Sequence, residues 1–235
     1  MKDSGVAWMG EVPADWEVTR LKFAVLDGDG IQMGPFGGML LDLDDEDTGY
    51  KVYGQENTIS GDFTLGSRWV SEDRFNELKR YSLGDGDVVL THKGSLGNAR
   101  LIAGLDRPGI ADSDTIRIRA NVNKVSPCFL ELLLHNAGYV AEQILYARRG
   151  AVLAGLNTET IANITLVLPP IVEQTALLDM LTRRLAEFDD GIDECSMGIE
   201  LLKERRTALI SAAVTGKIDV RGSMSAPATL DAKAA

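Results

Sequence analysis

The chain has 235 residues, a formal net charge of −11 at pH 7 and 45% hydrophobic residues. This length suits one domain with an extension, and the apolar content is enough for a core. No run approaches the roughly 18–20 apolar residues of a membrane span, and the first residues lack the apolar segment of a signal peptide. We therefore expect a cytoplasmic protein without membrane contacts, and the acidic balance argues against indiscriminate nucleic-acid binding.

The charge is unevenly distributed along the chain. Residues 1–67 carry 4 basic and 13 acidic side chains, whereas residues 68–149 carry 12 basic and 10 acidic ones. Any DNA-binding face is therefore expected in the second stretch or on loops folded against it. Cys128 and Cys195 occur in apolar helical patterns, which predicts small core residues. With only two histidines, they form no zinc-ligand spacing, and we expect no metal.

The pattern of residues predicts a mixed α/β (α+β) domain with a mostly antiparallel sheet, followed by one long helix. Gly54–Asn57 is predicted to be a polar turn, and Ser71 is a plausible helix cap. In chain order we expect strands at 17–21, 50–53, 68–70, 87–91, 98–103, 114–119 and 164–168. We expect helices at 71–80 and 126–134, a further helix from the end of that one to about residue 148, and a short helix at 158–162.

The segment from Pro170 to about Ala213 has sustained coiled-coil periodicity. Its apolar positions recur at spacings of three and four, and no second segment of this length exists to cover them. We therefore expect a helix from another molecule to pack there. Gly191 and Gly198 indicate either close approach of that helix or a tolerated bend. The predicted interface residues are Leu178, Leu181, Leu185, Phe188, Ile192, Cys195, Ile199 and Leu202.

Catalytic motifs are missing from the sequence. The glycines from Gly28 to Gly34 miss the dinucleotide-binding fingerprint by one residue, and there is no phosphate-binding P-loop or nucleophile elbow. The segment Asp112-Ser113-Asp114 suits a turn before a strand more than a metal site. His92 has no acidic or nucleophilic companion nearby in sequence. We expect a chain that is not an enzyme.

A binding surface is the remaining interpretation. Thr91-His92-Lys93-Gly94-Ser95 places donors for phosphate oxygens on a tight hairpin. Amide side chains are able to pair with adenine edges, and arginines with guanine or phosphate. For each such residue an ordinary exposed side chain is the alternative. The candidate DNA-binding residues are Gln55, Asn57, Arg68, Thr91, His92, Lys93, Ser95, Arg100, Arg148 and Arg149.

Several segments, in this order and spacing, resemble the specificity subunits of type I restriction-modification systems. The opening from Trp8 to Leu21 resembles the start of a target-recognition domain of that family. The further matching segments are Gly34-Pro35-Phe36-Gly37, Gly54-Gln55-Glu56-Asn57, Gly86–Gly97, Gly155-Leu156-Asn157-Thr158, Leu168-Pro169-Pro170 with Glu173-Gln174, and Ala213–Ile218. The resemblance covers about residues 8–221.

The resemblance implies a non-catalytic role in recognising a two-part DNA sequence. Such subunits carry two recognition domains separated by two antiparallel helices. They bind no cofactor themselves but dock modification subunits, which bind S-adenosylmethionine and methylate adenine, and through these a restriction subunit. This chain has about half the expected size. We expect residues 1–168 to form one target-recognition domain, 169–221 the helix, and 222–235 a disordered tail.

The half size and the uncovered helix together predict a two-fold antiparallel homodimer. The axis should pass near Ile192, with Leu185 approaching Ile199 of the partner subunit. Such a dimer would read an interrupted palindrome. For the assembly, the alternatives are pairing with a different half-subunit and docking alone on modification subunits. For the function, the alternatives are an enzyme acting alone, either a methyltransferase or a nuclease, and a coiled-coil scaffold or degenerate half-subunit that reads no DNA.

Overall fold

The computed structural model describes residues 1–6, 9–40, 43–44, 47, 49–92, 97–149 and 156–218, with the backbone alone at 148 and 149. The chain forms two compact units, residues 1–179 and 180–235. The first turns of the long helix therefore belong to the globular unit. The contact boundary lies about ten residues beyond the boundary expected from sequence.

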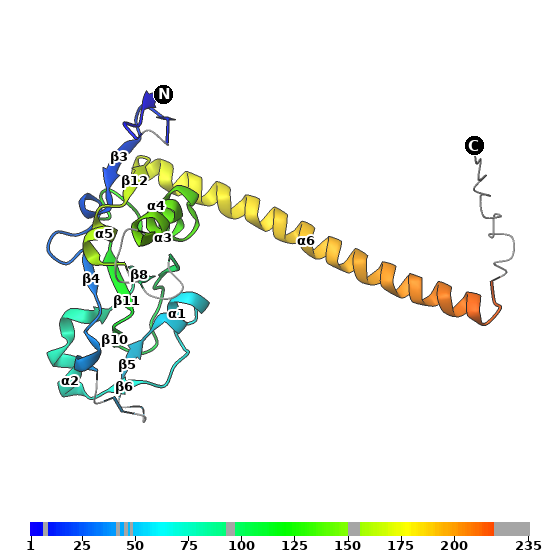
Figure 1. Ribbon diagram of the computed structural model, residues 1–235, viewed down its shortest axis with the longest axis horizontal. Coiled ribbons are helices and arrows are strands. Elements are labelled where there is room, and N and C mark those ends of the chain that lie inside the picture. The colour runs from blue at the N-terminus through cyan, green and yellow to red at the C-terminus, as the bar shows by residue number, and fades with distance from the viewer. Residues whose placement is uncertain are drawn as a thin grey trace, which may run out of the picture. The chain divides into compact units, whose positions relative to one another are not determined.

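Within the described residues, the globular unit contains two four-stranded sheets and two strand pairs (Figure 1). All pairings are antiparallel except that of β5 with β10, which confirms the mixed fold with mostly antiparallel sheets. One sheet has the strand order β4 (Ile31–Met33), β11 (Thr115–Arg119), β8 (Asp87–Thr91) and β9 (Ala99–Leu101). The other sheet has the strand order β6 (Trp69–Val70), β5 (Tyr50–Tyr53), β10 (Gly109–Ala111) and β7 (Ser82–Leu83). The two strand pairs are β1 (Lys2–Asp3) with β2 (Glu11–Val12), and β3 (Glu17–Arg20) with β12 (Thr165–Leu168).

The helices begin where the sequence supplies caps. The hydroxyls of Ser71 and Ser126 accept hydrogen bonds from Arg74 N and Phe129 N, so both helix starts fall where expected. The α-helices are α1 (Gln55–Ser60), α2 (Glu72–Glu77), α3 (Pro127–Asn136), α4 (Gly138–Arg149), α5 (Thr158–Ala162) and α6 (Ile171–Val214); single 3₁₀ turns are η1 (Leu21–Phe23), η2 (Gly37–Met39) and η3 (Lys79–Tyr81).

The main core lies between the β4-β11-β8-β9 sheet and the helices α3, α4 and α5. Alternation along β11 places Ile116 and Ile118 in this core. Arg117 points to the other side and is buried too. Its guanidinium donates to the carbonyl oxygens of Arg80 at 3.1 Å and Ser82 at 2.8 Å, and it pairs with Asp29. Arg117 therefore links β11 to the segment that leads into the second sheet.

The cysteine prediction is wrong. Cys128 and Cys195 are both exposed free thiols. Cys128 follows the proline at the first position of α3, on the face turned away from Phe129 and Leu130. The apolar pattern around each cysteine identified a helix correctly, but Cys128 lies on the exposed side of α3, and Cys195 lies on the apolar side of α6 that its own domain leaves uncovered.

α6 begins in the core of the globular unit. Gln174 is fully buried: its Oε1 accepts from Ser126 N at 2.9 Å, and its Nε2 donates to the carbonyl oxygens of Lys124 and Pro169. Leu177 and Leu178 pack against the same core. Leu178, expected at an intermolecular interface, is therefore half-covered by its own domain, which corrects that part of the prediction.

Beyond its first turns, α6 exposes the apolar stripe that the sequence predicted. It runs as one continuous helix to Val214, from yellow to orange in Figure 1. Leu181 is half-buried and Cys195 is exposed. The large side chains that follow are exposed to 57%, 67%, 61%, 53% and 65%, in the order Leu185, Phe188, Ile192, Ile199 and Leu202. We call these five residues the α6 stripe.

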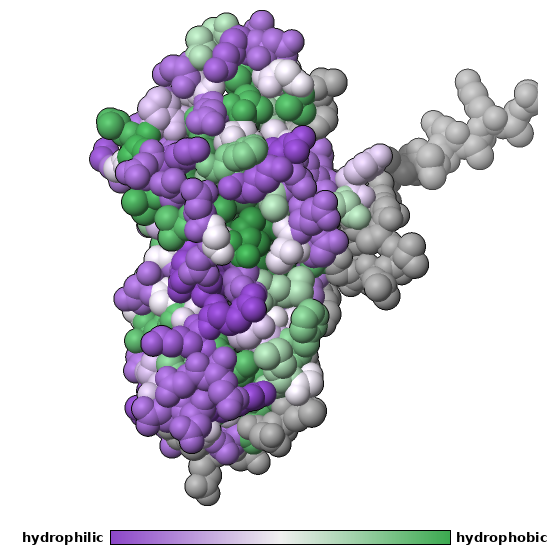
Figure 2. Space-filling view, turned by 90° about the vertical axis from the view of Figure 1, so that its left-hand side faces the viewer, coloured by the Kyte–Doolittle hydropathy of each residue, from purple (hydrophilic) through white to green (hydrophobic). Residues whose placement is uncertain are grey.

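The face of the globular unit drawn in Figure 2 carries no such stripe. Figure 2 shows one face of the molecule, where hydrophobic residues emerge in separate areas between hydrophilic ones. Within the described residues, no helix is both long enough and apolar enough to cross a membrane. The α6 stripe is thus a line of exposed apolar side chains at heptad spacing, on a helix that also exposes apolar residues such as Met197 and Leu201 outside the stripe.

Candidate nucleic-acid interface

The predicted hairpin is present. β8 and β9 pair antiparallel, with Leu90 opposite Ala99, and Thr91 N donates to Asn98 O at 3.0 Å. Gly97 has a φ of +84°, a conformation that favours glycine where the chain enters β9. Lys93 and Ser95, two of the candidate DNA-binding residues, lie outside the described residues.

Thr91 and His92 are wrong as DNA contacts, because both are buried. The Nε2 of His92 lies 2.8 Å from the carbonyl oxygen of Ser113, so Nε2 carries the proton and donates it. The backbone N of His92 donates to Asp114 O at 3.2 Å. His92 therefore fastens the end of β8 to the Asp112–Asp114 turn and is not available to phosphate.

Asn57 is also wrong as a base contact. Gly54–Asn57 is not a free turn, because Gly54 caps α1 and the helix starts at Gln55. Asn57 is fully buried: its Oδ1 accepts from Gly54 N, and its Nδ2 donates to the carbonyl oxygens of Asp62 and Leu65, each at 2.9 Å. Its amide is saturated. Gln55, in the first turn of the same helix, is half-exposed and stays a candidate.

Replacing Asn57 with alanine should destabilise the fold by about 2 kcal/mol, because one backbone donor and two carbonyl oxygens lose their partner. Gln55→Ala is the matched control, two residues away in the same helix, and should leave the melting temperature unchanged. Thermal unfolding followed by circular dichroism measures both. Equal melting temperatures for the two variants would show that the Asn57 amide does not hold this loop.

The two partly exposed arginines of the candidate set differ in their surroundings. Arg68 Nη2 lies 3.1 Å from both Glu56 Oε1 and Asp112 Oδ2. Burial lowers the pKa of Arg68, but attraction to the two carboxylates raises it overall. Arg100 belongs to none of the ion pairs found among the described side chains. Its charge is thus more available than that of Arg68.

Arg100 lies beside His135 of α3. The backbone N of Ala99 donates to His135 Nδ1 at 3.3 Å. Burial, and then the charge of Arg100, lower the pKa of His135 below its ordinary value of 6.5. His135 is therefore neutral at neutral pH and adds no positive charge to this surface.

The structure brings together the flanks of two segments that carry basic residues. Leu156 N donates to His92 O at 3.0 Å, so the chain leaving residue 155 meets the end of β8. At the other flank of the hairpin tip, Gly97 lies beside α4: a methyl group added to its Cα would be 3.9 Å from the side chain of Ile144. α4 ends at Arg148 and Arg149, whose side chains lie outside the described residues.

The candidate interface is therefore the region around His92, Gly97, Ile144 and Leu156. It is bordered by Arg100 on β9 and by the end of α4. Among the described side chains, Arg100 is the candidate that brings a positive charge to its border. We call this region the hairpin face.

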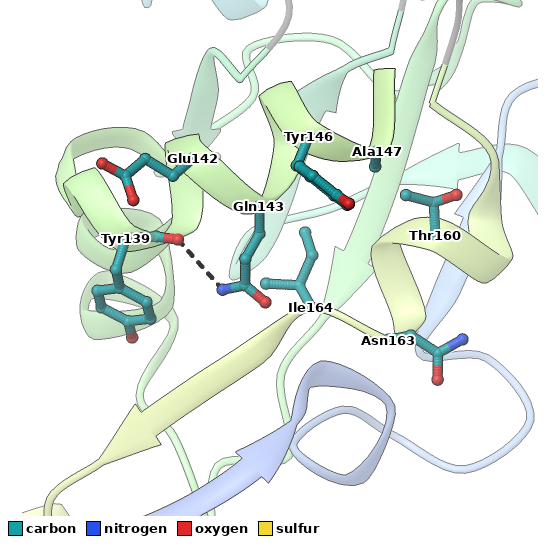
Figure 3. Close-up of a pocket in the computed structure, with 8 residues that line it drawn as sticks. All are labelled: Tyr139, Glu142, Gln143, Tyr146, Ala147, Thr160, Asn163 and Ile164. Carbon is teal, nitrogen blue, oxygen red and sulfur yellow. Dashed lines mark hydrogen bonds between the residues drawn. The ribbon is translucent and has the colours of Figure 1, made fainter. Parts of the chain in front are cut away.

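A separate hollow lies along the outer face of α4 (Figure 3). Tyr139, Glu142, Gln143 and Tyr146 form its wall at spacings of three and four, which lie on one side of a helix. Its volume is about 600 Å³, and α5 closes its other side. Sequence reasoning missed this hollow, because nothing in residues 138–149 shows which side of the helix the core leaves uncovered.

Comparisons with known proteins identify relatives of the whole chain. No protein-family model matches it. It is 23% identical over 211 residues to the putative type I restriction enzyme MjaX specificity subunit of Methanocaldococcus jannaschii, covering 88% of this chain and 47% of that protein. It is 26% identical over 226 residues to the MjaVIII specificity subunit of the same organism, covering 91% and 48%. The chain is related to the specificity subunits of type I restriction enzymes. It spans about half the length of these curated specificity subunits.

Solved structures show the same fold in specificity subunits. The HsdS subunit from Thermoanaerobacter tengcongensis aligns with a TM-score of 0.52 at 19% identity, over 76% of this chain and 40% of that one. A chain from work on complex assembly and conformational transition in the type I R-M system aligns with a TM-score of 0.57 at 19% identity, over 87% and 47%. The mixed fold and the long helix expected from sequence are thus those of specificity subunits.

Proposed function

We propose that this chain is one half of a DNA-specificity subunit of a type I restriction-modification system. Two copies pair through the α6 stripe and present two recognition domains to a two-part DNA target. The chain performs no chemistry itself. It docks modification subunits, which bind S-adenosylmethionine and methylate adenine, and through them a restriction subunit.

The observation that carries this proposal is the apolar side of α6 that the described residues of the chain leave uncovered. The relatives are about twice as long, and five large apolar side chains of α6 are more than half exposed. Large exposed apolar surfaces on soluble proteins mark interaction sites. A second copy covers the stripe, since a two-fold arrangement buries the same surface on each subunit.

The direct test is a DNA titration of the complex formed with purified modification subunits. We expect sequence-dependent binding whose log affinity falls linearly with log salt concentration, because phosphate contacts release counterions. Complexes that form but bind all sequences equally, or bind none, would favour the scaffold without DNA-reading activity. The net charge of −11 explains why the isolated chain should bind DNA only weakly.

Arg100→Ala should weaken binding of this complex about tenfold and reduce the magnitude of the salt slope by about 1, the loss of one phosphate contact. Arg68→Ala is the matched control and should change both less, because Glu56 and Asp112 already neutralise that arginine. Fluorescence anisotropy at several salt concentrations measures both variants. A larger effect at Arg68 than at Arg100 would show that Arg100 is not the phosphate contact expected here.

A further inference from the structure

The apolar side of α6 beyond its first turns consists of two rows of side chains. One row has a residue every seven positions and contains Leu185, Ile192 and Ile199. The other row has the same spacing and contains Phe188, Cys195 and Leu202. We call them the Leu185 row and the Phe188 row. Both run along the same side of the helix, as the two apolar positions of a heptad do.

A two-fold axis between antiparallel helices restricts how these rows meet. The rotation keeps each row on its own side of the interface, so the rows of one kind from both copies share one side. Side chains fill each level along the helices only when one comes from each row, because two from the same row would crowd one side and leave a gap on the other. Near the middle of the rows, this condition places the axis at Asp190, at Met197, or midway between them, which is between Asp193 and Glu194.

The midway position matches the apolar rows with themselves. It sets each of their six side chains level with an apolar side chain of the partner subunit, and each pairing occurs twice. The pairs, one residue from each copy, are Leu185 with Leu202, Phe188 with Ile199, and Ile192 with Cys195. A second copy in antiparallel orientation therefore complements the whole exposed seam.

The other two positions leave mismatches. The first sets Leu202 level with Leu178 of the partner subunit, which already packs against the core of its own globular unit. The last sets Phe188 level with Arg206 of the partner subunit, so that a guanidinium would enter the apolar seam. The midway position is therefore the one at which the exposed apolar residues cover one another.

Two glycines agree with the midway position. Gly191 and Gly198 lie beside the Leu185 row, and a Cβ on either would meet nothing within 4 Å in the single chain. Each costs about 1 kcal/mol relative to alanine within a helix, and no contact among the described residues requires either. With the midway axis, Gly191 of one copy and Gly198 of the other lie on the same side of the interface, about 3 Å from the same level. The missing side chains allow close approach of the two helices on both sides of the axis.

We propose that two copies pair with the axis between Asp193 and Glu194, so that the Leu185 and Phe188 rows close on each other. The inference rests on the proposed homodimer and specifies the alignment of its helices. It moves the axis about two residues beyond Ile192, because an axis at Ile192 would set Leu185 level with Ile199 of the same row.

Disulfide cross-linking of the full chain tests this alignment. Leu185→Cys and Leu202→Cys are combined in a chain whose two natural thiols are removed by Cys128→Ser and Cys195→Ser. The two new thiols of one chain lie 17 residues apart, about 25 Å along the helix, too far for a bridge within that chain. We expect covalent dimers after mild oxidation, measured by non-reducing electrophoresis.

Three matched cysteine pairs report the other alignments. Leu185→Cys is combined with the natural Cys195 for the axis at Asp190, with Ile199→Cys for the axis at Ile192, and with Leu209→Cys for the axis at Met197. We expect each of them to cross-link at least about tenfold more slowly than the pair with Leu202→Cys, because their sulfur atoms are not level.

Arg184→Glu provides an independent measurement. The midway axis brings Arg184 of one copy and Arg205 of the other to the same side of the interface, about 3 Å from the same level. Arg184→Glu should lower the dimer dissociation constant about fivefold in sedimentation equilibrium, because two repulsive pairs become attractive. Arg183→Glu is the matched control, with the same charge change at a neighbour that lies away from the seam, and should leave the constant unchanged.

The outcomes separate this inference from the proposed function. Faster cross-linking by one of the other three pairs would overturn the alignment and retain the homodimer. Equal cross-linking by all four pairs would indicate parallel helices and also overturn it, as would Arg184→Glu chains that dimerise no more tightly than Arg183→Glu chains. A wild-type chain that sediments as a monomer would reject the proposed homodimer itself.

Discussion

Replacing Ile192 and Ile199 together with aspartate is expected to convert the dimer into monomers. In the proposed pairing, both residues lie between the two helices, so the double variant buries four carboxylates without partners. Such burial costs several kcal/mol, and we expect the dissociation constant to rise at least about 1,000-fold, about 4 kcal/mol. Light scattering coupled to size-exclusion chromatography measures the mass, and circular dichroism verifies that the helix is retained.

Met197→Asp is the matched control for this substitution. Met197 is as exposed in the single chain as Ile192, at 62% against 61%. It follows Ile192 by five residues, which places it about 140° around the helix and away from the α6 stripe. We expect Met197→Asp to remain dimeric. If the two variants dissociated equally, exposed apolar side chains anywhere on α6 would drive association, and not the α6 stripe in particular.

Replacing Gln174 with alanine is expected to lower the stability of the globular unit by about 3 kcal/mol. The change leaves Ser126 N and the carbonyl oxygens of Lys124 and Pro169 without their partners inside the protein. For a domain of this size, we expect the melting temperature to fall by roughly 6–12 °C. Calorimetry measures the change.

The neighbouring residue provides the control for Gln174. Thr175 is exposed, and its hydroxyl bonds only to the helix carbonyl of Ile171, so Thr175→Ala should change the melting temperature little. If Gln174→Ala had the melting temperature of the wild type, water would be replacing the hydrogen bonds of the lost amide. The start of α6 would then be held by Leu177 and Leu178 alone.

The long helix could be predicted closely because its signal is periodic and local. The double proline before Ile171 and Thr215-Gly216 after Val214 mark ends that the structure reproduces within a residue. The point at which the helix leaves the core could not be predicted. Leu178 and Leu185 occupy equivalent heptad positions, and only the fold shows that the first packs against the core while the second is exposed.

The candidate DNA contacts could be predicted less well, because polar side chains have two uses that sequence does not separate. Asn57 and His92 carry hydrogen-bonding groups that suit DNA, and in the structure those groups hold loops. Arg117 shows the same ambiguity on a strand, since it alternates with Ile116 and Ile118 and is nevertheless buried. Burial of a polar residue depends on distant partners, which a local pattern does not contain.

Mapping methylated adenines in the genome, with and without the gene for this chain, tests the account most directly. Two identical recognition domains related by a two-fold axis predict methylation at an interrupted palindrome, and loss of methylation at those sites when the gene is deleted. An unchanged methylation pattern after deletion would contradict the specificity role. Methylation at a target with two unrelated halves would contradict the pairing of this chain with a second copy of itself.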